Sequence, residues 1–396
     1  MFPTQFTGAS FTWEHVKSKY LFENISLKGF QDLPVLSVTQ DKGVVYRDNL
    51  DIDIKYDLST LKNYKLVQPG DFIISLRSFQ GGFETSYLTG ITSPAYTIFN
   101  FIDNQDKDHA FWQYLFKRID FINSLKRVTF GIRDGKAISF SQFGDVKVKY
   151  PSFNEQKHIA TALTKLDNTI QLHERKCEEL NLIKKALLQK LFPKKDEVIP
   201  EVRYKSFSAA WEQRKLGDLA EIVRGASPRP ISDPKWFDDN SDIGWLRISD
   251  VTNQNGRIYY LEQHISKLGQ EKTRVITEPH LLLSIAATVG KPLINYIKTG
   301  VHDGFLIFLN PKFDLEYMYQ WLEMFRPKWN KYGQPGSQVN LNSNLVRKQK
   351  IALPSREEQQ RISSFLKQLD SLIALHQRKL EKLKQLKKFL LQNMFI

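Results

Sequence analysis

The chain has 396 residues, enough for two or three domains that each bury a core, so a single undivided domain is not expected. Hydrophobic residues make up 41% of it but form no run of about 18 residues that would cross a bilayer, and residues 1–10 lack a secretory signal pattern, so we expect a cytoplasmic protein without membrane contacts. The formal net charge of +14 favours a polyanionic partner, and because the basic residues are spread along the chain we expect nucleic acid rather than an acidic membrane surface.

Residues 1–150 have the pattern of a globular domain. Short apolar stretches between glycine and proline turns, at 69–75 and 89–99, predict strands, and the aromatic amphipathic segment 111–125 predicts a helix. After the segment 69–75, two glycines follow Arg77, Ser78 and Gln80. Guanidinium and amide groups bond to guanine and adenine edges, so we predict that these three residues contact DNA, although an ordinary solvated turn has the same composition.

Residues 151–192 predict one long helix that starts after Pro151. Apolar residues recur at spacings of three and four along it, the pattern of a helix that packs on another helix. A helix of about 37 residues would be about 55 Å long. The chain's single cysteine, Cys177, lies on this seam; it excludes an internal disulfide and a zinc site with paired cysteines, and we expect a buried, inert thiol.

A charged segment with two prolines and no apolar periodicity, residues 193–205, is predicted to be a linker. The following segment, 206–353, repeats the first domain faintly: 211–212 matches the Trp-Glu of 13–14, 279–284 and 299–308 predict strands at corresponding places, and an aromatic helix is expected over 315–329. As DNA contacts in this second domain we predict Arg224, Arg229, Arg247, Lys291, Ser337, Gln338 and Asn340.

The last segment, 354–396, repeats the long helix. Residues 354–395 align with 151–192 at a constant offset of 203, and 21 of the 42 positions are identical. Each helix would expose an apolar stripe alone, so we predict that the two pack as an antiparallel coiled coil. We expect two equivalent seam histidines to set the register, with a metal site or a catalytic role as the alternative. The predicted interface consists of Leu163, Leu166, Ile170, His173, Leu180, Leu366, Leu369, Ile373, His376 and Leu383.

This order predicts an α+β protein of two similar α/β domains joined by two paired helices, with pseudo-twofold symmetry. Dimeric DNA-binding proteins read half-sites roughly 34 Å apart because their symmetry matches that of DNA. Because the two domains differ in sequence, we expect an asymmetric, two-part target. The alternative is a helical scaffold whose domains bind RNA or protein.

Motifs for an independent catalytic activity are incomplete. Residues 310–313 (NPKF) lack the second proline of an adenine methyltransferase loop, and the Gly-Lys at 290–291 lacks the rest of a phosphate-binding loop. No histidine pair has convincing metal-ligand spacing. We therefore expect no enzyme activity, no cofactor and no metal in this chain.

The whole chain resembles the specificity subunit of type I restriction-modification systems. The motifs that carry the resemblance are 154–157 (NEQK) with 166–167 (LD), 357–360 (EEQQ) with 369–370 (LD), 211–218 (WEQRKLGD) and 283–291 (LSIAATVGK). By this resemblance 1–150 and 206–353 are target recognition domains, and 151–192 and 354–396 are the central and distal spacer helices. The resemblance implies a DNA-binding subunit that binds two modification subunits, which use S-adenosylmethionine to methylate adenine. It also implies restriction subunits that use ATP and Mg.

Overall fold

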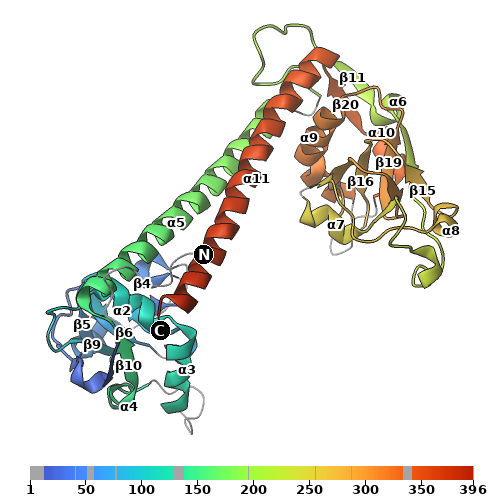
Figure 1. The fold of residues 1–396 in the computed structure, drawn as a ribbon. Helices are drawn as coiled ribbons and strands as arrows, with labels where there is room; N and C mark the ends of the chain where they lie inside the picture. Colours follow the sequence, from blue (N-terminus) through green and yellow to red (C-terminus); the bar gives the residue numbers. More distant parts are fainter. Residues whose placement is uncertain are drawn as a thin grey trace. The chain divides into compact units, whose positions relative to one another are not determined.

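The computed structural model describes residues 13–40, 42–50, 58–75, 78–128, 138–194, 196–254, 256–286, 288–332 and 341–395 (Figure 1). The chain divides into two compact units. The first unit contains residues 1–173 and 379–396, and the second contains residues 174–378. Each unit therefore takes one globular domain and a part of each long helix, α5 (Phe153–Lys190) and α11 (Arg356–Asn393).

The centre of the first unit is an antiparallel sheet of strand order β2-β9-β6-β7. Three antiparallel pairs accompany it: β3 with β4, β5 with β8, and β1 with β10. The strands are β1 (Glu14–Lys17), β2 (Phe22–Ile25), β3 (Leu36–Thr39), β4 (Gly43–Tyr46), β5 (Lys65–Val67), β6 (Phe72–Ile74), β7 (Glu84–Thr85), β8 (Gly90–Thr92), β9 (Thr97–Phe101) and β10 (Lys147–Tyr150).

Aromatic side chains fill the core of this unit. Phe22, Phe72 and Phe99 come from three neighbouring strands and are at most 1% exposed, and the rings of Phe72 and Phe99 stack at 5.3 Å. Trp112 and Phe116 of helix α2 (His109–Phe116) pack in the same core. The many phenylalanines therefore pack the core, as their apolar sequence surroundings indicate. The helical segments are η1 (Ser18–Tyr20), η2 (Arg47–Asn49), η3 (Leu58–Asn63), α1 (Ser78–Gly81), α2 (His109–Phe116), α3 (Ile119–Val128) and α4 (Phe140–Asp145).

The single helix predicted over 111–125 is wrong, because the chain turns between α2 and α3. The backbone N–H groups of Lys117 and Arg118 bond to carbonyls three residues back, which closes α2 with a tighter turn. The side chain of Lys117 pairs there with Glu84, which is 7% exposed. The turn thus gives a buried carboxylate its partner, a requirement that helical periodicity cannot reveal.

The second unit has a larger sheet of strand order β12-β19-β16-β17-β14, a three-stranded sheet β13-β18-β15, and the pair β11 with β20. Its strands are β11 (Glu212–Lys215), β12 (Glu221–Arg224), β13 (Gly244–Leu246), β14 (Arg257–Ile258), β15 (Arg274–Ile276), β16 (Leu281–Ser284), β17 (Pro292–Asn295), β18 (Thr299–Val301), β19 (Phe305–Leu309) and β20 (Lys350–Leu353). Its helical segments are α6 (Leu216–Leu219), η4 (Pro234–Trp236), α7 (Ile248–Asn253), α8 (Lys267–Gln270), α9 (Leu315–Phe325), η5 (Arg326–Tyr332) and α10 (Ser343–Lys348).

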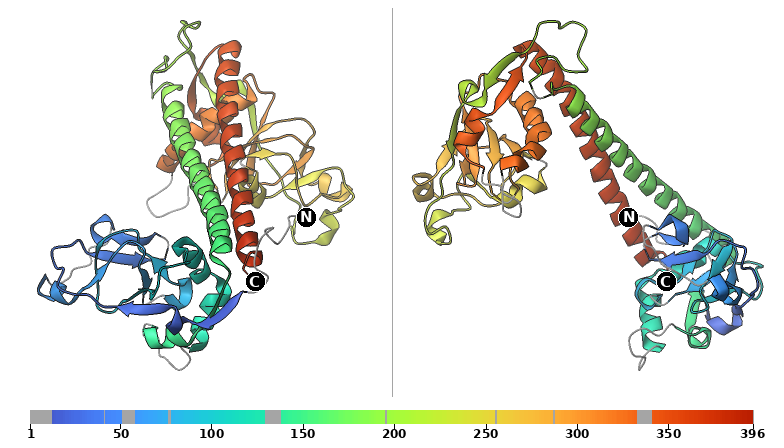
Figure 2. Two further views of the ribbon diagram at one scale, coloured as in Figure 1. Left: turned by 60° about the vertical axis from the view of Figure 1, so that its left-hand side comes forward. Right: turned by 180° about the vertical axis from the view of Figure 1, so that it is seen from behind.

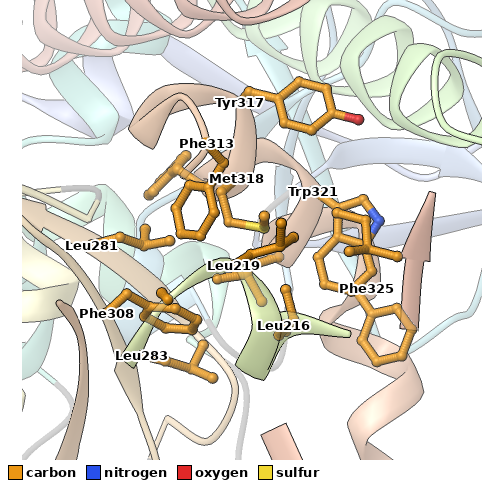
Figure 3. Packing of buried hydrophobic residues seen from close by; sticks show 14 of the residues in the cluster. Leu216, Leu219, Leu281, Leu283, Phe308, Phe313, Tyr317, Met318, Trp321 and Phe325 are labelled. Carbon is orange, nitrogen blue, oxygen red and sulfur yellow. The ribbon is translucent and has the colours of Figure 1, made fainter. Parts of the chain in front are cut away.

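One face of the larger sheet packs on α9. Leu281 and Leu283 from β16 and Phe308 from β19 lie against Met318 and its neighbours on α9 (Figure 3). The helix predicted over 315–329 ends earlier as an α-helix, at Phe325, and continues as the 3₁₀ helix η5. Pro327 explains the change, because it lacks the N–H that an α-helical bond requires.

In each unit the two long helices run side by side in opposite directions (Figures 1 and 2). In the first unit Lys387 pairs with Asp167 at 2.6 Å, and in the second Lys184 pairs with Asp370 at 2.5 Å. Both partners of one pair lie 203 positions from their counterparts in the other. The sequence repeat is therefore also a repeat of the helix register within each unit, and the predicted α+β architecture with antiparallel paired helices is confirmed.

The start of each long helix is fixed to its domain by the same glutamine. Gln156 and Gln359 each accept a hydrogen bond from the backbone N–H of the aspartate that caps α2 or α9, at 3.1 and 2.8 Å. Each also donates to the carbonyl of the proline before its own helix, at 2.9 Å. Both glutamines are buried. The family motif at 154–157 and 357–360 thus marks the joint between domain and helix.

Described residues of the predicted linker 193–205 form no helix or strand, but the segment is attached to the second unit. Arg203 donates two hydrogen bonds to the Glu358 carboxylate, at 2.7 and 2.8 Å. Trp211, after the linker, donates to the same carboxylate at 3.2 Å. The linker is therefore bound to the first turn of α11.

Candidate nucleic-acid interface

Two of the predicted contact residues of the first domain, Ser78 and Gln80, lie on the short helix α1. Gln80 is exposed there, and Arg77 lies outside the described residues. Ser78 is 1% exposed, and its hydroxyl accepts a hydrogen bond from the backbone N–H of Ser75 at 2.8 Å. Ser78 thus holds the turn together, and its burial argues against the predicted contact with a base.

A glycine fixes the position of this turn. Gly82 has φ +79°, and a Cβ on it would lie 2.0 Å from the carbonyl oxygen of Phe116. Only glycine can adopt this backbone conformation so close to α2 without strain. The turn that presents Gln80 is therefore held against the core of the first unit.

In the second unit, the loop after β12 brings two predicted residues together. Arg224 ends β12 and donates its Nε–H to the carbonyl of Asp303 at 2.6 Å, and Arg229 donates to an Asp303 carboxylate oxygen at 2.7 Å. Ser227 donates its hydroxyl to the other carboxylate oxygen at 2.9 Å. The backbone N–H of Asp303 in turn donates to the Ser227 hydroxyl at 3.1 Å. One aspartate thus organises the whole loop.

The charge on Asp303 is favoured by its surroundings. Burial raises the pKa of its carboxyl group, but the Ser227 hydrogen bond and the nearby His302, Arg229 and Arg224 outweigh that effect and hold the pKa below its ordinary value. Burial also lowers the pKa of His302, which favours the neutral imidazole. The loop therefore carries an ionised aspartate and two arginines.

The other predicted residues of this domain are placed differently. Arg247 is paired with Asp250 and Glu262, at 3.1 and 3.0 Å, so two carboxylates already balance its charge. Lys291 is half-buried, and burial lowers the pKa of its amine despite the charge of Glu323. Ser337, Gln338 and Asn340 lie outside the described residues. The structure thus brings together Arg224 and Arg229 and leaves Arg247 and Lys291 apart from them, each beside acidic groups.

An open groove of about 650 Å³ in the second unit is lined by Arg247 and by His302. Its lining is mainly apolar and aromatic, with four polar side chains. The lining residues are Ile231, Ser232, Pro234, Phe237, Trp245, Arg247, Ile248, Gln263 and His302. Because His302 precedes Asp303, the groove adjoins the arginine-bearing loop.

Six of the ten residues predicted to form the interface between the two long helices are buried. Leu163 and Leu366 are fully buried, and Leu166, Ile170, Leu180 and Ile373 are at most 8% exposed. Leu369, His173, His376 and Leu383 are half-buried. Cys177 is buried and free, and burial raises the pKa of its thiol. Among the described residues, no group of three or more histidine, cysteine, aspartate or glutamate side chains is arranged to hold a metal ion.

Sequence reasoning missed a charged cluster that joins the second domain to its helices. Arg257 donates to both oxygens of Glu316 and to Asp370, at distances from 2.7 to 3.2 Å, and is 12% exposed. Asp370 also accepts from Gln320 and pairs with Lys184. The first unit has a simpler joint, in which Tyr114 donates to Asp167 at 2.8 Å. In the sequence, only the Leu-Asp motifs at 166–167 and 369–370 indicated where these two joints lie.

The fold and these loops define a duplicated protein in which each half carries one globular domain on a pair of long helices. The sequence profile described as the type I restriction modification DNA specificity domain matches it twice, at residues 16–182 and 209–385. These two stretches span most of the chain. The chain therefore belongs to the family of type I restriction modification DNA specificity proteins.

Individual proteins with similar sequences are also specificity subunits. The putative type I restriction enzyme MjaX specificity subunit of Methanocaldococcus jannaschii is 26% identical over 287 residues, which cover 69% of this chain and 64% of that protein. The MjaVIII specificity subunit of the same organism is 26% identical over 272 residues, 62% of this chain and 60% of that protein. The chain thus matches somewhat less than two thirds of the length of these relatives.

Two solved structures share the fold. The S subunit of the type I restriction-modification system of M. genitalium is 13% identical, with a TM-score of 0.62 and coverage of 100% of this chain and 99% of that one. A chain from a study of complex assembly and conformational transition in the type I R-M system is 14% identical, with a TM-score of 0.57 and 98% of each chain covered. In the described part of the chain, no helix has the length and apolar character needed to span a membrane.

Proposed function

We propose that this chain is the DNA specificity subunit of a type I restriction-modification complex, and that it recognises an asymmetric, two-part target in double-stranded DNA. The observation that carries the proposal is the double match to a DNA specificity domain. Each match falls on one globular domain and the helix that follows it. The glutamine that joins each domain to its long helix repeats, whereas the residues predicted to contact DNA differ between the two domains, as two different half-sites require.

In this proposal the chain supplies recognition and the partners supply chemistry. Two modification subunits bring S-adenosylmethionine and methylate adenine, and restriction subunits bring ATP and Mg. The incomplete catalytic motifs of the chain and the names of its relatives support this division. The alternative of a scaffold that binds RNA or protein is less favoured, because it gives no reason for two DNA specificity domains.

The test is to map adenine methylation across a host genome by single-molecule sequencing. One strain carries this chain with the methyltransferase encoded beside it, and the control strain lacks only this chain. We expect a gapped, asymmetric methylation motif in the first strain and its loss in the second. An identical methylation pattern in both strains would show that the chain does not direct the enzyme.

A further inference from the structure

Three arginines of the second unit lie beside the loop built on Asp303. Besides Arg224 and Arg229, Arg274 at the start of β15 donates its Nε–H to the carbonyl of Arg224 at 2.8 Å. We infer that Arg224, Arg229 and Arg274, here called the arginine rim, bind paired acceptor atoms of DNA, and that Asp303 is the residue that positions the rim. This inference rests on the proposed function and names the surface through which the second domain acts.

The first argument concerns Arg224 and Arg274, whose terminal guanidinium nitrogens remain available. Arg224 and Arg274 both use Nε–H for a bond to a backbone carbonyl, at 2.6 and 2.8 Å. This fixes the side chain and leaves its two terminal nitrogens, the edge of the fork that forms bidentate bonds with phosphate or with O6 and N7 of guanine. Both side chains belong to exposed residues. Each arginine is thus oriented in advance for such a contact, which reduces the entropy lost on binding.

The second argument is charge. Asp303 is the only carboxylate found within ion-pairing distance of the rim in the described part of the chain, and it pairs with Arg229. Arg247 and Arg257, by contrast, each meet two carboxylates. The rim therefore keeps an excess of positive charge, which an anionic ligand would neutralise.

The third argument is that the loop beneath the rim is fixed. The Thr273 hydroxyl donates to the carbonyl of Ala226 at 2.5 Å, and the N–H of Ala226 donates to the carbonyl of Val301 at 3.0 Å. Gly225 lies so close to β18 that a Cβ would meet the His302 carbonyl oxygen at 2.2 Å. Asp303 completes this frame through Ser227. Three separate chain segments thus hold the rim in one arrangement.

The experiment uses the complex of this chain with its modification subunits and a duplex that contains the mapped target. Affinity is measured by fluorescence anisotropy between about 50 and 200 mM salt for Arg224→Ala, Arg229→Ala and Arg274→Ala. The control is Arg214→Ala on β11, an exposed arginine that is paired with Glu212 at 2.9 Å and lies outside the rim. Methylation is mapped for the same variants.

Each rim variant is expected to weaken binding about 5- to 150-fold, and the control to leave it unchanged. If the ligand is phosphate, binding weakens for every sequence and the salt slope falls by about one per arginine lost. If the ligand is guanine, the motif relaxes at one position of one half-site. Arg274→Lys, which keeps the charge but loses the fork, should weaken binding as well and guards against a folding defect in the alanine variant.

For Asp303, an electrostatic role and a positioning role predict opposite changes in DNA affinity. Removal of a negative charge near DNA strengthens binding if the charge acts only through the electrostatic field, whereas Asp303→Asn should weaken binding several-fold if Asp303 positions Arg229 and Ser227. Tighter binding by Asp303→Asn would overturn the positioning role.

Unchanged affinity and motif in all three arginine variants, with the wild-type complex still methylating its target, would overturn the rim and leave the proposed function intact.

Discussion

Two glutamates at equivalent positions of the repeat differ in their hydrogen-bond partners and burial. Glu155 and Glu358 are separated by the repeat offset of 203 and both lie in the first turn of a long helix. Glu358 is 1% exposed and receives three hydrogen bonds from Arg203 and Trp211. Glu155 is 8% exposed, and one of its carboxylate oxygens has no partner in the described part of the chain. Burial raises the pKa of the Glu155 carboxyl more than the neighbouring Trp13 lowers it.

We predict different effects on the free energy of unfolding when these two glutamates are replaced by glutamine. A raised pKa in the folded state favours folding at low pH, and that contribution is lost as the pH rises through the folded pKa. Glu155→Gln removes the buried charge and should stabilise the protein, or leave it unchanged, at pH 7, by at most about 1 kcal/mol.

Glu358→Gln breaks a buried ion pair and should cost about 3 kcal/mol. Urea unfolding at pH 5 and pH 8 measures the free energy of unfolding of both variants. The two variants are each other's control, and equal destabilisation at pH 8 would contradict the assignment of different environments.

Single residues also show how far the site follows from sequence. Arg224 and Arg229 are recognisable because they stand in one short polar run rich in glycine and proline. Asp303, which accepts hydrogen bonds from both arginines, is 79 positions from Arg224 in the sequence. Arg274 is 50 positions from Arg224. Neither Asp303 nor Arg274 stands in a motif. Their proximity depends on the pairing of β12 with β19 and of β15 with β18, which a linear pattern does not reveal.

Among the elements, the long helices were predicted best. The predicted segments 151–192 and 354–396 contain α5 and α11, which run from Phe153 to Lys190 and from Arg356 to Asn393. Their apolar spacing is a local property that each helix carries along its own length. The sheets were predicted only as short strands, because β1 pairs with β10 and β11 with β20 across whole domains. Such pairing is decided by packing over long sequence distances.

The cluster around Arg257 joins four elements of the second unit. Arg257 begins β14, Glu316 lies on α9, Asp370 on α11 and Lys184 on α5. Burial raises the pKa of Glu316, but hydrogen bonds and charge from Arg257, with further bonds from Tyr296 and Lys367, hold it at about 2. The ionised carboxylate thus favours the folded state.

Substitution of Arg257 by methionine should therefore destabilise the second unit by about 3 kcal/mol at pH 7, because it removes the main partner of the largely buried Glu316 carboxylate and one of the two cations that pair with Asp370. The stabilisation from Glu316 is present above about pH 4.5 and is lost as the pH falls toward 2, so this pH dependence should shrink in the variant.

Thermal unfolding monitored from pH 7 to pH 3 measures both effects. Lys298→Met, which removes an exposed pair with Asp242, is the control and should change stability by less than about 0.5 kcal/mol. A variant with the same acid sensitivity as the wild type would contradict the role of Arg257.

At the scale of the whole molecule, the two units repeat one joint and carry different loops. Each domain should therefore read its half-site independently in the proposed function. Exchange of residues 1–150 for the corresponding domain of a relative is expected to change one half of the methylation motif and keep the other half and the gap. Methylation mapping of the chimera measures this. A change in both halves would show that the domains do not read separately.

The helix ends have a consequence for the order in which the protein can fold. Phe395 is 3% exposed, its ring stacks on Phe111 at 5.2 Å, and it contacts Trp13 at 6.1 Å. The ribosome makes Trp13 and Phe111 early and Phe395 only after the entire second unit. During synthesis, the aromatic surface of the first domain that Phe395 covers therefore stays exposed while more than 200 residues are added. The domain that is begun first is completed last, and premature termination within α11 would leave it unfinished while most of the second unit is already made.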